Sequence, residues 1–272
     1  MNTSEKNFYW TDEHESRLNA VAHDQAQPLR VGRRVLKLVG PQGDRYVDAV
    51  LGHRVDRNQS LSIQPNQQLR PLQISRHFQL FHEQGNKDGS LDTLVQFAAA
   101  DLALAEDAVV LLGADAGPFL KKLYVELDNP PDLEKQEGLF DKDQKEVAKP
   151  ILDSILEGIE QLQQRGQFGD YFVIVSPALY REAYTNRQNP VDAPIYQITP
   201  LLREKDGFLF SEAAEGKRGV ICSGSRGTIN LAVPVDLHVE NLPPDEKGQP
   251  QLRAAQQFRL VIDDRDAREA LK

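Results

Sequence analysis

The sequence predicts an α+β fold, in which helices and strands occur in mixed order along 272 residues. A long helix is predicted over Ser90–Leu112, where apolar residues recur at spacings of three and four. A long strand is predicted over Gln68–Glu83, where apolar and polar residues alternate. Several shorter strands between Gly207 and Ile262 complete the pattern. This mixed order of elements is the basis of the α+β prediction.

A helix and a hairpin are predicted near the start of the chain. Thr11 can cap a helix over Asp12–Gln25, because acidic residues follow in the first turn and suit the positive end of the helix dipole. Gly40–Gly43 has the sequence GPQG, in which proline presets φ and the last glycine suits a type I turn. We therefore expect a hairpin between the Val35–Val39 and Tyr46–Val50 runs.

The long strand follows the hairpin. Leu72, Ile74, Phe78 and Leu80 fall on one face at strict period two, so an extended strand over Gln68–Glu83 would reach about 50 Å at ~3.3 Å per residue. A ribbon of that reach leaves its edges unpaired in water. We therefore expect either the fold or another copy of the chain to cover this arm.

The Ser90–Leu112 helix has the clearest pattern in the sequence. Ser90 is its expected cap and Gly113 its expected end, which gives about 33 Å of helix at 1.5 Å per residue. Phe97 and Leu104 make its other side apolar as well. A helix that is apolar over so much of its circumference lies inside the fold or between subunits.

The second half of the chain begins with a polar stretch, Asp128–Lys149, which is predicted to be a solvated surface loop or insertion. Pro150 is expected to open a helix that ends before Gly166. Ser176 is expected to cap a shorter helix, and the stretch Tyr184–Pro194 is expected to be a loop. The remaining strands are predicted at Tyr171–Val175, Gly207–Ser211, Arg218–Cys222, Thr228–Glu240 and Gln251–Ile262.

Composition narrows the class of protein. The net charge of −9 and the lack of a dense basic run argue against nucleic acid as a partner. The single cysteine, Cys222, excludes an internal disulfide framework and fits a cytoplasmic location. The first residues lack the features of a signal peptide, and no apolar run approaches the ~18 residues of a spanning helix. A membrane partner is therefore not expected.

Motifs with catalytic or metal-binding potential are weak. His14-Glu15 with His23 has the wrong spacing for a zinc-binding HExxH pair. Asp263-Asp264-x-Asp266 lies beside two arginines and is better explained as a self-neutralised surface. Gly224–Gly227 lacks the lysine and helix of a phosphate loop, and Cys222 lies in an apolar run without a histidine partner. The sequence therefore predicts no enzyme, no metal site and no catalytic residues.

Arg33–Gly52 carries a family resemblance. An Arg-rich lead into a strand, then Gly-Pro-x-Gly, then a strand ending in Leu-Gly, resembles the N-terminal region of encapsulins, the bacterial nanocompartment shell proteins. Nearly the whole chain follows the encapsulin order of elements. Local phrases that agree with this order are Arg76-His77-Phe78 with Glu83, Ala105-Glu106-Asp107, Leu112-Gly113, Asp236-Leu237-His238-Val239 and Phe258-Arg259-Leu260.

The resemblance implies the tailed-bacteriophage capsid fold and a division of the chain. Residues 1–53 would form the N-terminal helix and first hairpin of a peripheral domain, and residues 54–84 the extended loop. Residues 85–127 would hold the spine helix of the peripheral domain, and residues 128–226 the axial domain. Residues 227–272 would return to the peripheral domain.

The resemblance also implies a function. Encapsulins assemble into closed icosahedral shells around a cargo enzyme, commonly a dye-decolourising peroxidase or a ferritin-like iron-handling protein. The implied partners are other copies of this chain and a cargo enzyme bound through its C-terminal targeting peptide. The positions that resemble the cargo-peptide docking surface are Leu18, Leu29, Asp236, Leu237 and Val239.

Two further sets of residues take roles from the resemblance. The polar loop after Tyr184 stands where the family's axial loop lines a pore for small substrates, which implies pore-lining roles for Asn186, Arg187, Gln188 and Asn189. Some relatives stack a flavin on a tryptophan where this chain has Phe81 or His82, so no cofactor is expected. The positions implied to form the intersubunit extended loop are Leu61, Ile63, Leu69, Leu72 and Ile74.

Two alternatives stay open at this stage. A soluble enzyme or binding protein could assemble its site from distant residues that no motif reveals. A phage major capsid protein would share the fold, but an interior packed with DNA fits poorly with an acidic chain whose arginines are not clustered.

Overall fold

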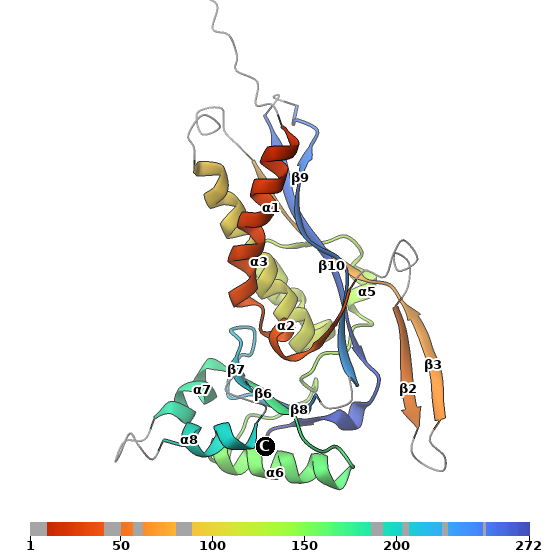
Figure 1. Ribbon diagram of the computed structural model, residues 1–272, viewed down its shortest axis with the longest axis vertical. Helices are drawn as coiled ribbons and strands as arrows, with labels where there is room; N and C mark the ends of the chain where they lie inside the picture. Colours follow the sequence, from red (N-terminus) through yellow and green to blue (C-terminus); the bar gives the residue numbers. More distant parts are fainter. Residues whose placement is uncertain are drawn as a thin grey trace, which may run out of the picture.

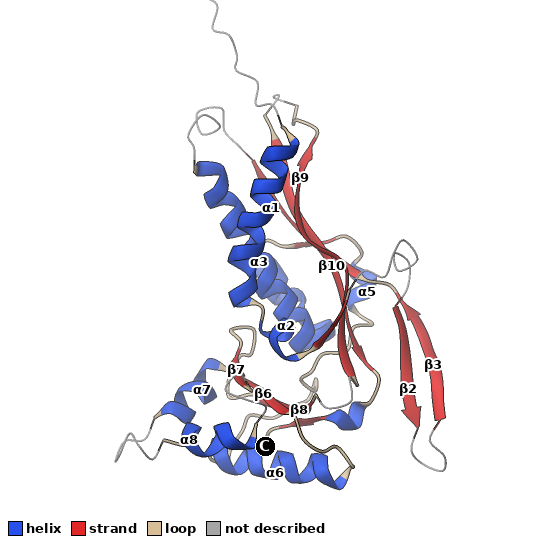
Figure 2. Ribbon diagram, viewed as in Figure 1, coloured by secondary structure: helices blue, strands red, loops and turns tan. Residues whose placement is uncertain are grey.

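A computed structural model describes residues 10–40, 50–56, 62–79, 89–185, 193–202, 207–224, 228–246 and 249–272. Two packed units and one projecting hairpin are visible in Figure 1. The large unit is a five-stranded sheet with helices α1 and α3 on one face, and the small unit is a four-stranded sheet with helices α6, α7 and α8 (Figure 2).

The sheet of the large unit is assembled from distant parts of the sequence. Its strand order is β1-β9-β10-β4-β5. β1 pairs parallel with β9, whereas the other neighbours are antiparallel. The strands are β1 Lys37–Val39, β4 Leu72–Gln79, β5 Glu126–Leu127, β9 Ile229–Leu242 and β10 Gln251–Ile262.

Helices α1 (Asp12–Ala26) and α3 (Ser90–Leu112) cover one face of this sheet (Figure 1). The Thr11 side chain caps α1 by accepting a hydrogen bond from the His14 N–H. α3 is buried along most of its length, as its apolar circumference predicts. Ser90 begins α3 without capping it, because Gly89, at φ 99°, occupies the cap position.

The segment predicted to be a solvated loop instead passes through the core. Leu139 and Phe140 are buried, and their backbone N–H groups donate to the carbonyls of Val110 and Leu111 in the last turn of α3, at 2.9 and 2.8 Å. These contacts satisfy helix-end carbonyls that would otherwise lack partners. The surface-loop prediction for Asp128–Lys149 was wrong because its abundant charges masked four buried apolar side chains, Leu133, Leu139, Phe140 and Val147.

Short helical turns link α3 to the rest of this segment. They are η3 Gly113–Ala116, α4 Gly117–Lys122 and α5 Pro130–Leu133. Arg259 of β10 holds the segment against the sheet, because its buried guanidinium donates to the carbonyls of Asp132 and Lys135 at 3.3 and 3.2 Å. The same group donates to the Arg70 carbonyl at 2.9 Å. Burial lowers the pKa of Arg259.

The small unit contains the helices and strands predicted between Pro150 and Cys222, whereas α8 and β11 were not predicted. Its strand order is β11-β8-β6-β7. Ser176 caps α7 as predicted, by accepting a hydrogen bond from the Leu179 N–H. The elements are α6 Ile151–Gln164, β6 Tyr171–Val175, α7 Pro177–Tyr184, α8 Ile195–Ile198, η5 Thr199–Leu201, β7 Phe208–Phe210, β8 Gly219–Ser223, η6 Arg265–Ala267 and β11 Arg268–Ala270.

The last residues of the chain are built into the small unit. Leu271 is 1% exposed, and its N–H donates to the Gly219 carbonyl at 2.9 Å. A Cβ atom at Gly219 would lie 2.8 Å from the Leu271 side chain, so the glycine leaves room for that leucine. The Ser154 hydroxyl donates to the Lys272 carbonyl at 2.7 Å.

Strands β2 (Val50–Asp56) and β3 (Ser62–Leu69) form an antiparallel hairpin that stands away from both units (Figure 1). We call this hairpin the arm. The prediction of one continuous strand over Gln68–Glu83 was wrong, because β3 ends at Leu69 and β4 starts at Leu72. β4 lies between β10 and β5 in the large sheet, so it has its partners within the chain.

The predicted N-terminal hairpin was wrong in its first strand. β1 pairs with β9, and Val35 ends a short helix instead of starting a strand. The predicted turn and most of the Tyr46–Val50 run lie outside the described residues.

Candidate functional site

The candidate site surrounds a short helix, α2 (Val31–Val35), between the two units. Asp107 of α3 fixes the start of α2, because its two carboxylate oxygens accept the N–H groups of Val31 and Gly32 at 2.8 and 2.9 Å. Burial raises the pKa of Asp107 to about 7, although these two backbone hydrogen bonds oppose the shift. Asp107 therefore holds α2 against the end of α3.

A network of ion pairs ties α2 to α3 and β9. Arg33 makes two hydrogen bonds to the fully buried Glu106, at 2.7 and 2.8 Å, and one to Asp236, at 2.8 Å. Arg30 donates to Asp236 at 3.3 Å and also to Gln256. Burial alone would raise the pKa of Asp236, but Arg33 and Arg30 beside it hold that pKa below its usual value.

A cationic pocket opens over this network. It has a volume of about 310 Å³ and lies between the end of α1, helix α2 and strands β1 and β9. Arg30, Arg33 and Arg34 face it, together with the carboxylate of Asp236. Such a pocket suits an anionic or hydrogen-bonding group of a partner. The remaining lining residues are His23, Gln27 and Leu38.

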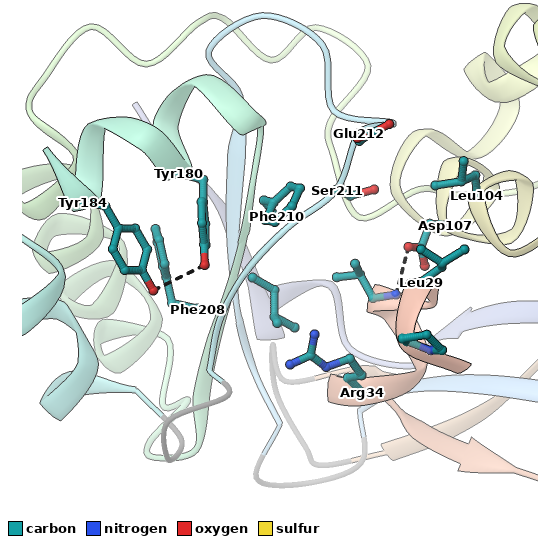
Figure 3. A pocket seen from close by; sticks show the side chains of 13 residues that line it. Leu29, Arg34, Leu104, Asp107, Tyr180, Tyr184, Phe208, Phe210, Ser211 and Glu212 are labelled. Carbon is teal, nitrogen blue, oxygen red and sulfur yellow. Dashed lines mark hydrogen bonds between the residues drawn. The ribbon is translucent and has the colours of Figure 1, made fainter. Parts of the chain in front are cut away.

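A second hollow, the interunit groove, lies on the other side of Arg34 (Figure 3). It has a volume of about 400 Å³. Leu29, Leu104 and Asp107 line it from the large unit, and aromatic side chains face them from α7 and β7 of the small unit. Arg34 lines both hollows, so the cationic pocket and the groove are neighbours.

The aromatic wall of the interunit groove is a connected cluster. Tyr180 stacks on Phe208 with ring centres 5.5 Å apart, and its ring centre lies 4.7 Å from that of Phe210. The hydroxyls of Tyr180 and Tyr184 are 3.3 Å apart, and this hydrogen bond raises the pKa of Tyr184 to about 12. The wall therefore presents apolar ring faces, which suit an apolar side chain of a partner.

The structure divides the five predicted docking residues into two groups. Leu18, Leu237 and Val239 are at most 1% exposed, because α1 packs on β9 there. Their docking role is corrected to a core role. Leu29 lines the interunit groove and Asp236 lines the cationic pocket, so these two reach the surface.

The other predicted site residues have different outcomes. Leu72 and Ile74 are buried core residues of β4, at 1% and 0% exposure, so they are not part of the arm. Ile63 and Leu69 lie in β3 of the arm. Leu61 and the four predicted pore residues Asn186, Arg187, Gln188 and Asn189 lie outside the described residues, as do Phe81 and His82.

Sequence reasoning missed the network and the aromatic wall. Two adjacent acids, Glu106 and Asp107, in an apolar helix were a usable signal, because buried charges require partners. Arg33 and Arg30 were candidates for those partners. No comparable signal marked the wall, since its residues are far apart in the sequence and look like core residues.

The weak catalytic motifs take structural roles. Asp264 caps a short helix by accepting the Asp266 N–H, and its other oxygen accepts a hydrogen bond from Gln167. Cys222 is buried, and burial raises its pKa to about 12. Among the described residues there is no cluster of three or more metal-ligating side chains. No described helix is long and apolar enough to cross a membrane.

Solved structures share this fold at low sequence identity. A virus-like particle protein from Pyrococcus furiosus aligns over 96% of this chain and 100% of its own, with a TM-score of 0.66 and 11% identity. The capsid protein of Myoviridae phage XM1 aligns over 89% and 91%, with a TM-score of 0.58 and 11% identity. The SrpI encapsulin from Synechococcus elongatus aligns over 89% and 86%, with a TM-score of 0.54 and 9% identity. The chain therefore has the phage-capsid fold, an α+β fold.

Sequence comparisons show which family with this fold the chain matches. It is 30% identical over 97 residues to the type 1 encapsulin shell protein EncA of Myxococcus xanthus, and the match spans 36% of this chain and 33% of that protein. A family model described as "Encapsulating protein for peroxidase" matches residues 2–249. Proteins of this family are structural shell proteins and not enzymes. This chain belongs to the encapsulin family.

Proposed function

We propose that this chain assembles with copies of itself into a closed icosahedral shell that encloses a cargo enzyme. The observation that carries the proposal is the family match over residues 2–249, joined to the capsid fold of the described chain. The arm supports it, because a two-stranded ribbon is marginal in water unless another chain pairs with it. The description of the family favours a peroxidase as cargo, and a ferritin-like iron-handling protein is the second candidate.

The experiment that tests assembly shortens the arm. Residues 53–66 are replaced by a short Gly/Ser turn, which spares Arg70 and its hydrogen bond to Arg259. We expect a folded subunit that forms few particles, whereas the unaltered chain forms uniform hollow shells by negative-stain microscopy. Equal shell formation by both chains would show that the arm is not an intersubunit element.

We propose that cargo docks on the surface formed by the interunit groove and the cationic pocket. Leu29 and Asp236 are the predicted docking residues that reach this surface. The groove fits an apolar anchor of a peptide, and the pocket fits a polar or acidic group beside it. Arg34, which lines both hollows, would contact the peptide between these two points.

Leu29→Asp tests this docking surface, because it places a charge among apolar groups. Shells of the variant should form normally but contain several-fold less co-purified cargo. Leu156→Asp is the matched control, since Leu156 is a 45% exposed leucine on α6, away from the groove. Equal cargo content in Leu29→Asp and control shells would exclude the groove.

We propose that the segment between α7 and α8 lines a pore for small substrates. Its residues Asn186, Arg187, Gln188 and Asn189 lie in the sequence between Tyr184 and Phe208 of the aromatic wall. If five copies of Arg187 meet at an opening, their positive potential should favour anions, with screening over a Debye length of ~8 Å. Arg187→Glu should therefore reverse the charge preference for entry of small substrates to an encapsulated reporter enzyme. Identical entry rates for the unaltered chain and the variant, at both low and high salt, would exclude this segment from the transport path.

A further inference from the structure

The cationic pocket gathers arginine side chains around one hollow. Three guanidinium groups face it, those of Arg30, Arg33 and Arg34. Asp236 supplies the one carboxylate among the lining residues that the structure describes. The surface that this pocket presents to a ligand is therefore cationic, and it suits an anion.

Two of the three guanidinium groups are withdrawn from water. The side chain of Arg30 is 4% exposed and that of Arg33 is 11% exposed. Burial lowers the pKa of Arg30; the charge of Glu106 opposes this shift, and the charge of Arg33 adds to it. Buried charges are screened less than exposed ones. A negative charge in the pocket would therefore stabilise the Arg30 cation more than it would stabilise a surface arginine.

The two buried guanidinium groups retain hydrogen-bond donors. Each guanidinium has five N–H groups. Within the described chain, Arg33 uses three of them, on Glu106 and Asp236. Arg30 uses two, on Asp236 and Gln256, and its buried Nε has no hydrogen-bond partner among the described residues. The pocket therefore has more donors than its own carboxylates and amide engage.

The size of the pocket and the number of arginines favour one class of anion. Its volume of about 310 Å³ is roughly ten times the ~30 Å³ that one water occupies in the liquid, so a small polyatomic ion fits. A single arginine fork already engages both oxygens of a carboxylate. A phosphate group offers three strong acceptor oxygens and a charge near −2, so it can engage several guanidinium groups at once.

We propose that the cationic pocket binds one phosphate group per subunit, from free phosphate or from a small phosphorylated molecule. The site lies within one chain, so it does not depend on the proposed shell function. Asp236 is an internal competitor of the ligand, because its Oδ1 already accepts hydrogen bonds from Arg30 and Arg33 at 3.3 and 2.8 Å.

Calorimetric titration of orthophosphate tests the site on the full chain purified without cargo, at an ionic strength held constant with sodium chloride. We expect one site per subunit with a Kd of ~1 mM or tighter. Arg34→Gln should weaken binding at least about tenfold, because it removes a charged donor. Asp236→Asn should tighten binding several-fold, because it removes the competing negative charge. A general loss of folding cannot move the two variants in opposite directions.

Lys37→Gln is the matched control. It removes a positive charge from an exposed position of β1 that does not line the pocket. The Kd of this control should stay within about twofold of that of the unaltered chain, since exposed charges act weakly at a distance. An equal loss of affinity in Lys37→Gln and Arg34→Gln would show non-specific attraction and overturn the proposal.

Phenyl phosphate and acetate identify the source and the class of the anion. Phenyl phosphate that binds more tightly than orthophosphate would assign the site to an organic phosphate, and weaker or equal binding would assign it to the free ion. Acetate that binds as tightly as orthophosphate, no measurable orthophosphate binding, or an unchanged Kd in Arg34→Gln or Asp236→Asn would overturn the proposal. A chain that stays monomeric would contradict the shell function and leave the expected phosphate binding unchanged.

Discussion

Glu106 and Asp107 are consecutive acids in an apolar helix, and the fold satisfies them differently. The charge of Glu106 is compensated by the guanidinium of Arg33, whose Nε lies 2.7 Å from Oε1 of Glu106. Asp107 is compensated mainly by two backbone N–H groups. A full positive charge stabilises a buried carboxylate more than backbone dipoles do, which explains why burial raises the pKa of Asp107 to about 7. Asp107, beside the docking surface, therefore has a pKa close to neutral pH.

The titration of Asp107 predicts a pH dependence of stability. Its folded pKa of about 7 lies above the ordinary value of 3.8, so between these values the folded chain keeps a proton that the unfolded chain loses. The stability from this group is present at low pH and is lost as the pH rises toward 7. Asp107→Asn should therefore lose less stability than the unaltered chain between about pH 5 and pH 8. Parallel melting curves across this range would contradict the assignment.

Gly113 and Gly138 bring two backbone segments into direct contact. A Cβ atom on Gly138 would lie 2.4 Å from the Leu111 carbonyl oxygen, which is backbone and cannot move aside. Gly138→Ala should therefore destabilise the chain by about 1–3 kcal/mol, as overpacking does. Gly117→Ala is the control, because nothing lies within 4 Å of its added Cβ. Gly138→Ala should unfold at a lower denaturant concentration than Gly117→Ala. Equal unfolding midpoints would show that the backbone around Gly138 can accommodate a methyl group.

Elements with a local signal could be predicted, and elements defined by distant partners could not. The bounds of α3 and β10 followed from apolar periodicity and glycine positions. β4 was predicted as part of the arm because the period-two pattern that starts at Leu72 was extended back to Gln68, across Arg70 and Pro71, where the chain passes from the arm to the large sheet. Of the predicted docking surface, only Leu29 and Asp236 reached the surface, since burial depends on how α1 packs on β9.

Strand β11 is an edge strand of the small sheet, and the buried side chain of Leu271 follows it directly. Leu271 is buried against Gly158 and Gly219. Leu271→Ala should cost about 2–5 kcal/mol and leave a cavity between α6 and β8. Lys272→Ala should cost little, because the Lys272 contact to Ser154 uses its backbone carbonyl. Hydrogen exchange should show faster exchange in β8 and β11 for the leucine variant alone; unchanged protection there would show that the site repacks.

At the scale of the whole molecule, the two packed units differ from the arm in how they are completed. Both units bury continuous cores within one chain. The arm pairs with no third strand among the described residues. A subunit with a complete core and incomplete edges is suited to assembly without refolding, as expected for a shell protein.

The most direct test of this account is the mass of the purified chain in solution. Light scattering coupled to size-exclusion chromatography should show a single particle whose mass is a large multiple of the 30.6 kDa subunit. That mass should not change on dilution, because a closed shell has no free ends from which subunits dissociate. A stable species of 30.6 kDa under the same conditions would contradict the shell function.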